Sequence, residues 1–261
     1  MADFIRTEAE RCKMSNAVAD KLKQLPGILK DFFRRVPKAA WIGAGAAVAA
    51  VLIGVGAWQI SLQFRQTTLE GIDVSHYQGD ISWRAVSESQ KVKFVYLKAS
   101  EGSSYQDPTF AHNREMAEKY HIPVGAYHYY SISKTGADQA ANFISAVPKK
   151  KGALPPAIDI EANVASQSDF KTQLADFVSA VTKQYGQKPV FYVPPKVYNL
   201  LYDDYSGYHF WIIDVSGGKP TVKGWTFWQY SNKGKVSGIS GGVDCDRYRG
   251  SLRDFRKMLS K

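Results

Sequence analysis

Acidic residues recur at alternate positions in three short apolar segments of this chain. The segments are GIDVS at 71–75, AIDIE at 157–161 and VDCD at 243–246. Because side chains two apart on a β-strand share a face, each segment turns its carboxylates to one side and its apolar residues to the other. We therefore expect three strands to aim carboxylates at one interior. The candidate catalytic residues are Asp73, Asp159, Glu161 and Asp244.

Carboxylates gathered in this way can divide the work of glycoside hydrolysis. Burial and mutual repulsion raise the pKa of at least one of them. A carboxyl group that stays protonated near neutral pH serves as general acid, while an ionised neighbour stabilises positive charge. The structural alternative is that Asp73 and Asp244 cap strand ends or pair with Lys98 and Arg247. The combination of Asp73 with the 157–161 segment favours catalysis.

Aromatic residues at strand ends are candidates for binding a sugar, because sugar rings stack on flat side chains while polar groups hold the hydroxyls. The alternative for part of this set is packing in the core, where aromatic side chains are also common. Gln229 is a candidate polar partner for a sugar. The predicted substrate-binding residues are Tyr77, Tyr127, Tyr129, Trp211, Trp228 and Gln229.

The elements that must position these residues alternate between short apolar runs and helical patterns, which is typical of β/α units with a mainly parallel sheet. After the sixth predicted strand the connections are short and rich in glycine. We therefore expect an α/β, TIM-like barrel whose last part is mostly β. The predicted strands are 71–75, 93–99, 123–129, 156–161, 189–193, 210–214, 226–230 and 243–246. The predicted helices are 83–88, 108–120, 135–147 and 169–185.

An ordered set of stretches resembles the glycoside hydrolase family 25 muramidases, the Chalaropsis-type lysozymes. The stretches are GIDVSHYQG at 71–79, YLKASEGSSYQDPTF at 96–110, PVGAYHYY at 123–130, AIDIE at 157–161, PVFYV at 189–193 and WQYSNKGKVSGISGGVDCDRYRG at 228–250. The sequence departs from the family pattern at WIIDVSGG (211–218) and VPPKVY (193–198), where substrate contacts are expected.

The resemblance implies a catalytic domain over residues 71–261 with five β/α units and three further strands. It implies hydrolysis of the β-1,4 bond between N-acetylmuramic acid and N-acetylglucosamine in peptidoglycan. Glu161 matches the family's general acid, and Asp159, Asp73 and Asp244 match its other active-site carboxylates. Asp107 also matches a family position, but it directly precedes a proline and is expected to cap a helix. No cofactor is implied, and no Cys/His cluster has the spacing of a zinc site.

A long apolar stretch precedes this domain. Residues 39–58 carry no charge, and 20 helical residues span about 30 Å, the thickness of the hydrocarbon core. A cleaved signal peptide is the alternative, but 38 residues come before the stretch, whereas a signal peptide has a short basic start. The sequence predicts a transmembrane anchor at residues 39–62 and a linker at 63–70.

The charge of the flanking segments predicts the orientation of the anchor. Residues 1–38 contain nine Lys and Arg, and basic flanks stay on the cytoplasmic side. We expect a single-pass protein of the cytoplasmic (inner) membrane, with segment 1–38 inside and the catalytic domain periplasmic or extracellular.

Charge also bears on partners. Residues 65–261 hold 25 basic and 19 acidic side chains, an excess that suits either an anionic partner, such as a wall polymer or a lipid surface, or simply a basic soluble domain. No basic run with interleaved aromatics predicts nucleic-acid binding. The expected partners are peptidoglycan strands and the membrane. Two rival functions are a wall-binding module without activity and an enzyme on another N-acetylated glycan such as chitin, although the D-x-x-D-x-D-x-E run of the latter is absent.

Overall fold

The computed structural model describes residues 69–161, 164 and 168–260, which belong to one compact unit. The predicted cytoplasmic segment 1–38, the predicted anchor 39–62 and most of the predicted linker lie outside the described residues. Within the described ranges, every helix is too short or too polar to cross a bilayer.

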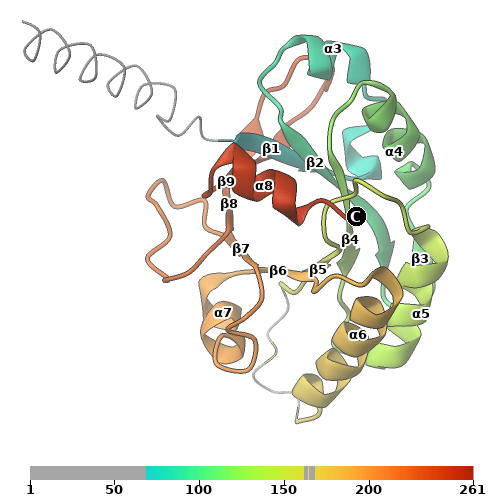
Figure 1. Ribbon diagram of the computed structural model, residues 1–261, viewed down its shortest axis with the longest axis vertical. Coiled ribbons are helices and arrows are strands. Elements are labelled where there is room, and N and C mark those ends of the chain that lie inside the picture. Colours follow the sequence, from blue (N-terminus) through green and yellow to red (C-terminus); the bar gives the residue numbers. More distant parts are fainter. Residues whose placement is uncertain (1–68, 162–163, 165–167, 261) are drawn as a thin grey trace, which may run out of the picture. The chain divides into compact units, whose positions relative to one another are not determined.

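Eight strands form a closed barrel, with β1 and β2 completing the ring (Figure 1). All neighbouring pairs are parallel except those of the last strand, which runs antiparallel to both of its neighbours. The eight predicted strands are confirmed, with shifts of a few residues at their ends. A short additional strand, β3 (Tyr105–Gln106), pairs with the end of β2. The barrel strands are β1 (Leu69–Val74), β2 (Phe94–Glu101), β4 (Val124–Tyr129), β5 (Ala157–Asp159), β6 (Val190–Val193), β7 (Phe210–Ile213), β8 (Phe227–Gly234) and β9 (Val243–Tyr248).

Helices follow each of the first five barrel strands, as the family resemblance implied. They are α3 (Trp83–Glu88), α4 (Phe110–Lys119), α5 (Gly136–Ala146), α6 (Phe170–Tyr185) and α7 (Pro195–Leu201). The first is preceded by a single 3₁₀ turn, η2 (His76–Gln78), and the last strand is followed by α8 (Leu252–Met258).

The sequence pattern predicted neither α7, which only the family resemblance implied, nor α8. Both are seven residues long, too short for a clear apolar period. Two prolines open α7, in the stretch 193–198 that departs from the family pattern. In the structure Pro194 occupies the N-cap and Pro195 the first helical position, where a missing N–H costs nothing.

Apolar side chains form two cores, one between the strands and the helices and one inside the barrel. In α6 the buried positions recur at helical spacing and face the outer core. The inner core is mostly aromatic and needs room at the strands beside it. A Cβ atom on Gly125 would lie 2.2 Å from Cε1 of Tyr96, and one on Gly71 would lie 2.3 Å from the ring of Phe94. The two glycines therefore let large rings fill the barrel.

Candidate active site

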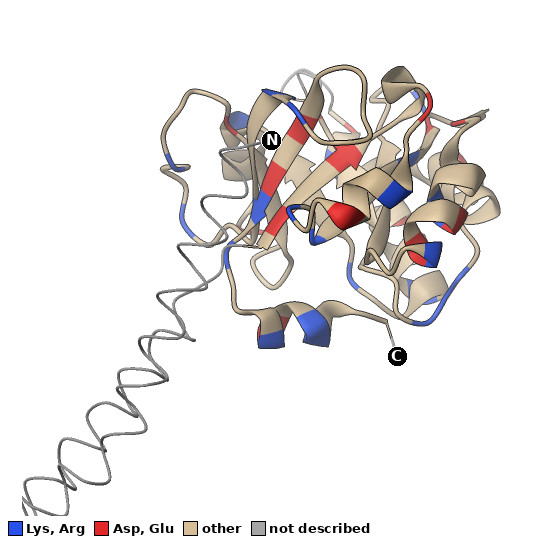
Figure 2. Ribbon diagram, turned by 90° about the horizontal axis from the view of Figure 1, so that it is seen from above, with Lys and Arg blue, Asp and Glu red and all other residues tan. Residues whose placement is uncertain are grey.

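The four predicted catalytic carboxylates meet at one end of the barrel. Asp73 and Asp159 lie at the carboxyl ends of β1 and β5, and Glu161 follows β5 by two residues. Because β9 runs antiparallel, Asp244 near its start reaches the same edge and lies opposite Asp73 in the strand register. Figure 2 shows acidic residues on neighbouring strands at this place. All four line a cavity of about 190 Å³.

Three of the predicted substrate-binding aromatics line this cavity as well. Tyr77 lies on η2 and is 80% exposed, whereas Tyr127 and Tyr129 come from β4 and are more buried. Five further lining residues were not predicted to bind substrate: Val74, Ser75, Gln78, Lys98 and Tyr192. The strand alternation could have indicated Lys98 and Tyr192, because Lys98 lies two residues from the inward-facing Tyr96 and Tyr192 two residues from the inward-facing Val190.

The prediction that Trp211 binds substrate is wrong, because the residue does not reach the cavity. Its side chain is fully buried inside the barrel. Its ring packs against the rings of Tyr192 and Tyr96, with centroids 4.3 Å and 4.9 Å away. Its Nε1 donates a hydrogen bond of 2.9 Å to Oδ1 of Asp246. Trp211 is therefore a core residue that orients a buried carboxyl group.

Trp228 and Gln229 do not line the cavity either. Trp228 faces the outside of the barrel, where its Nε1 donates to the backbone oxygen of Asp214 at 2.7 Å. Gln229 points inward, but it is buried behind the cavity wall and accepts a hydrogen bond of 2.8 Å from the Tyr192 hydroxyl. Gln229 also lowers the pKa of Asp244, against the larger effect of burial. It therefore supports one cavity residue and acts on the pKa of another.

The alternative that Asp73 and Asp244 pair with Lys98 and Arg247 is wrong. Lys98 Nζ bonds to Oε2 of Glu101 at 2.6 Å and lies 4.9 Å from the ring centroid of Tyr129. Arg247 bonds to Oε1 of Glu70 at 2.9 Å. Neither cation forms a salt bridge with Asp73 or Asp244 in the described part of the chain.

Burial and crowding raise the pKa values of the inner carboxyl groups. Burial is the largest cause of the raised pKa of Asp159, followed by the charge of Glu161, while Lys98 opposes the shift. Burial likewise raises the pKa of Asp73, followed by the charges of Asp246 and Asp244. The pKa values of both groups therefore lie above that of an ordinary aspartate, and the described residues give neither of them a salt bridge.

The outer two carboxylates are more accessible. Glu161 is exposed, and partial burial raises its pKa while the charge of Lys98 lowers it. Burial raises the pKa of Asp244 to about 6. A group that delivers a proton to substrate must reach the cavity and hold its proton more tightly than an ordinary glutamate does, and Glu161 lines the cavity with a raised pKa.

Asp107 holds the rim of the cavity. Its Oδ1 accepts hydrogen bonds from the backbone N–H and the hydroxyl of Thr109 at 2.9 Å and 2.7 Å, so it holds the turn before α4, whose N-cap is Thr109 and not Asp107. Its Oδ2 accepts from the backbone N–H of His76 at 3.0 Å and lies 2.8 Å from Nδ1 of that ring. Although burial raises the pKa of Asp107, these bonds lower it overall. Asp107 thereby fixes the turn that presents Tyr77.

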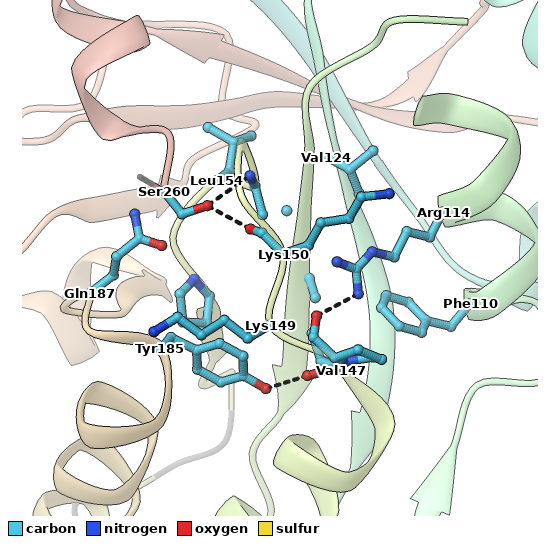
Figure 3. A pocket seen from close by; sticks show the side chains of 15 residues that line it. Phe110, Arg114, Val124, Val147, Lys149, Lys150, Leu154, Tyr185, Gln187 and Ser260 are labelled. Carbon is cyan, nitrogen blue, oxygen red and sulfur yellow. Dashed lines mark hydrogen bonds between the residues drawn. The ribbon is translucent and has the colours of Figure 1, made fainter. Parts of the chain in front are cut away.

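Another cavity lies elsewhere and does not share the site's chemistry. It has a volume of about 30 Å³ and is lined by side chains that include Phe110, Val147 and Tyr185 (Figure 3). The Tyr185 hydroxyl donates to the backbone oxygen of Val147 at 2.8 Å. This cavity holds about one water molecule and contacts none of the four carboxylates. Among the described residues, His, Cys, Asp and Glu form no group of three or more arranged to hold a metal ion.

Solved structures share this barrel. A family 25 glycosyl hydrolase from Bacillus anthracis has 39% identity and a TM-score of 0.66, with 72% of this chain and 92% of that chain covered. The bacterial lysozyme of Streptomyces coelicolor has 32% identity and a TM-score of 0.65, with 74% and 97% covered.

Sequence relatives agree with the structures. Lysozyme M1 of Streptomyces globisporus is 32% identical over 235 residues, which cover 82% of this chain and 79% of the relative. The uncharacterized protein YegX of Escherichia coli K12 is 30% identical over 200 residues, which cover 74% of each. Residues 72–239 match the family described as Glycosyl hydrolases family 25. The chain therefore belongs to glycoside hydrolase family 25 and is a glycoside hydrolase of the lysozyme and muramidase family, whose lysozymes act on peptidoglycan.

Proposed function

We propose that the chain is a membrane-tethered N-acetylmuramidase that hydrolyses the β-1,4 bond between N-acetylmuramic acid and N-acetylglucosamine outside the cytoplasmic membrane. The observation that carries the proposal is the meeting of Glu161, Asp159, Asp73 and Asp244 in one cavity walled by tyrosines. Relatives named lysozyme and N,O-diacetylmuramidase support the choice of substrate.

The cavity supports a division of labour between its carboxyl groups. Glu161 donates its proton to the glycosidic oxygen as the bond from that oxygen to the anomeric carbon breaks. Positive charge then develops at the anomeric carbon. Asp159, two residues before Glu161 and more deeply buried, stabilises that charge or orients the acetamido group of the sugar. A water molecule supplies the oxygen of the new reducing end.

Digestion of purified peptidoglycan sacculi tests the activity. Wild type should release fragments that end in reducing N-acetylmuramic acid, identified by mass spectrometry. Glu161→Gln and Asp159→Asn should each lower kcat by about 10²–10⁴-fold, since each removes a group that acts on the reacting bond. Glu115→Gln on the exposed face of α4 is the matched control and should retain full activity.

Loss of activity counts only for variants that remain folded, so thermal unfolding of each variant accompanies the assay. A wild-type protein that sediments with sacculi without releasing reducing ends would overturn the muramidase proposal in favour of a wall-binding module. Cleavage of chitin oligomers in preference to muropeptides would overturn the choice of bond.

The tether is supported by the uncharged stretch at 39–58 and by the basic residues before it. The chain's own cysteines allow a test, because Cys12 falls in the predicted cytoplasmic segment and Cys245 in the catalytic domain. In a Cys245→Ser variant, Cys12 should react with a membrane-impermeant maleimide only after the membrane is permeabilised. Labelling of Cys12 in intact cells would contradict the orientation, and recovery of the chain in the soluble fraction would contradict the tether.

A further inference from the structure

A basic groove lies on the outer face of β8 and β9, on the other side of these strands from the active-site cavity. Its volume is about 840 Å³, and none of the four catalytic carboxylates lines it. The side chains that give it its character are Lys219, Lys223, Trp225, Trp228, Arg247 and Arg249. The groove thus combines four cations with two indole rings.

Aromatic rings hold the two guanidinium groups of the basic groove. Arg249 Cζ lies 5.0 Å from the ring centroid of Trp225. Arg247 Cζ lies 5.6 Å from that of Trp228 and 4.8 Å from that of Tyr230. A stacked guanidinium keeps its N–H groups at the edge of the plane, where they can bind the oxygens of a phosphate or carboxylate.

Most of the charge of the groove is not neutralised by the protein. Arg247 pairs with Glu70, but Lys219, Lys223 and Arg249 form no salt bridge with any acidic side chain of the described ranges. Both lysines and Arg249 are exposed. The groove is therefore a place where part of the positive excess of the domain is concentrated and available to an anionic partner.

Hydrogen bonds fix the segment that bears the lysines. The hydroxyl of Tyr198 on α7 donates to the backbone oxygen of Lys223. Thr226 N–H donates to the backbone oxygen of Phe210 at 2.7 Å, and Arg249 N–H donates to that of Thr226 at 2.9 Å. The groove is thus attached to β7, β8 and α7 and forms part of the folded surface.

The groove lies where the described chain begins. In the strand register Leu69 pairs with Tyr248 and Glu70 with Arg247, so the first residues of β1 run beside the groove residues of β9. The predicted anchor ends at residue 62, and the six residues 63–68 can extend over at most about 22 Å. With the anchor in the bilayer, the start of β1 is held within that reach of the lipid headgroups.

We propose that the basic groove binds the headgroups of anionic phospholipids in the membrane that carries the anchor. This inference rests on the tether proposed above. Lysine and arginine are attracted to an anionic membrane surface, and tryptophan prefers the interface between water and hydrocarbon. Gln229, the inward-facing neighbour of Trp228 on β8, accepts a hydrogen bond from the cavity residue Tyr192, and Arg247 lies beside Glu70 on β1, the strand that bears Asp73. Binding at the groove therefore fixes the height and orientation of the active-site cavity above the membrane.

Cosedimentation of residues 66–261 with lipid vesicles tests the proposal without the anchor. This part can be used alone because it forms a compact unit. The match to the two solved relatives also covers 92% and 97% of their chains, so these proteins consist almost entirely of this domain. Vesicles of phosphatidylcholine mixed with phosphatidylglycerol should bind the domain, vesicles of phosphatidylcholine alone should not, and binding should weaken as salt is added.

Paired variants locate the binding surface. Lys223→Glu with Arg249→Glu should weaken binding to the anionic vesicles by at least about tenfold. The matched control is Lys119→Glu with Lys183→Glu, which makes the same change of charge on α4 and α6 and should bind nearly as wild type does. Both pairs should retain the activity of wild type on sacculi, because no substituted residue lines the cavity.

Three outcomes would overturn the proposal: equal binding to neutral and anionic vesicles, equal losses in the two pairs of variants, and binding to sacculi through the groove with none to vesicles. The last would assign the groove to the wall polymer. Failure of the groove is separable from failure of the muramidase, because vesicle binding and release of reducing ends are measured on the same protein. It is also separable from failure of the tether, which the labelling of Cys12 tests.

Discussion

Asp246 lies one step deeper in the barrel than Asp73, and its charge is, after burial, the largest cause of the raised pKa of Asp73. Asp244 pairs with Asp73 in the register and Asp246 with Gly71, so the two residues lie diagonally across β1 and β9. Oδ1 of Asp246 accepts the Trp211 indole N–H, while Oδ2 of each aspartate is buried without a hydrogen-bond partner in the described protein. Two adjacent carboxylates without a cation cannot both be ionised, so the pair holds a proton.

Replacing Asp246 by asparagine should make Asp73 ionise at a lower pH. The asparagine amide donates a hydrogen bond to Asp73 and removes the negative charge that, after burial, most raises its pKa. The chemical shift of the Asp73 carboxyl carbon, followed from pH 3 to about 9, measures the change. An unchanged titration in Asp246→Asn would show that the pair shares no proton, and Asp203→Asn on the exposed surface is the control.

Asp73→Asn should stabilise the fold at neutral pH while it abolishes activity. In the unfolded chain Asp73 ionises near pH 3.9, whereas burial holds the proton to a higher pH in the folded state. Above about pH 4 the folded state therefore binds more protons than the unfolded state does. The free energy of unfolding of wild type falls as pH rises over that range. An uncharged asparagine avoids this loss, which amounts to about 1.4 kcal/mol for each pH unit that separates the folded pKa from the unfolded one.

Thermal unfolding at a series of pH values measures the effect. At pH 7 the melting temperature of Asp73→Asn should exceed that of wild type by about 2–4 °C for each kcal/mol gained in the free energy of unfolding. The difference should disappear below about pH 4. A variant that is less stable than wild type throughout would show that Asp73 is ionised and favourably bonded in the fold.

The alternation of side chains on strands was sufficient to predict which carboxylates share an interior. It assigns a face from neighbouring residues alone, so Asp73 and Asp159 could be placed opposite Ile72 and Ile158 without knowledge of the fold. The same rule shows that the adjacent residues Trp228 and Gln229 face opposite sides of β8, and that only one of them could face the interior.

Depth along the barrel axis could not be predicted in this way. Trp211 faces inward, but whether it lies in the cavity or the core depends on the register of β7 with β6 and β8, which long-range pairing decides. The direction of β9 decides that Asp244 lies at the rim and Asp246 below it. The pairing of Lys98 with Glu101 depends on an irregularity in the register of β2 with β4, which no local pattern indicates.

Asp244 should set one limb of the dependence of kcat/KM on pH. Its pKa is raised to about 6 by burial, so its charge changes within the range in which the enzyme is assayed. The wild-type profile should bend near pH 6, and Asp244→Asn should remove that bend. Retention of the bend in the variant would assign it to another group, with Asp203→Asn again as the control for an exposed aspartate.

Lys98→Met should shift the ionisation of the catalytic pair to higher pH. The ammonium group of Lys98 lowers the pKa of both Asp159 and Glu161, although burial is the larger influence on each. Removing the charge leaves both groups protonated at a higher pH, so the whole kcat/KM profile should move upward in pH. Lys98→Arg keeps the charge and should restore the wild-type position; a profile that does not move in Lys98→Met would contradict this role.

Trp211→Phe distinguishes a core residue from a sugar-binding platform. The phenylalanine ring fills much of the same space but cannot donate to Asp246, so the variant leaves that buried oxygen without its 2.9 Å hydrogen bond. The free energy of unfolding should fall by about 1–3 kcal/mol, while KM for soluble muropeptides stays near that of wild type. Tyr127→Leu is the comparison variant, because Tyr127 lines the cavity and its loss should raise KM. A raised KM with unchanged stability in Trp211→Phe would place the indole against substrate and reverse the assignment made from its burial.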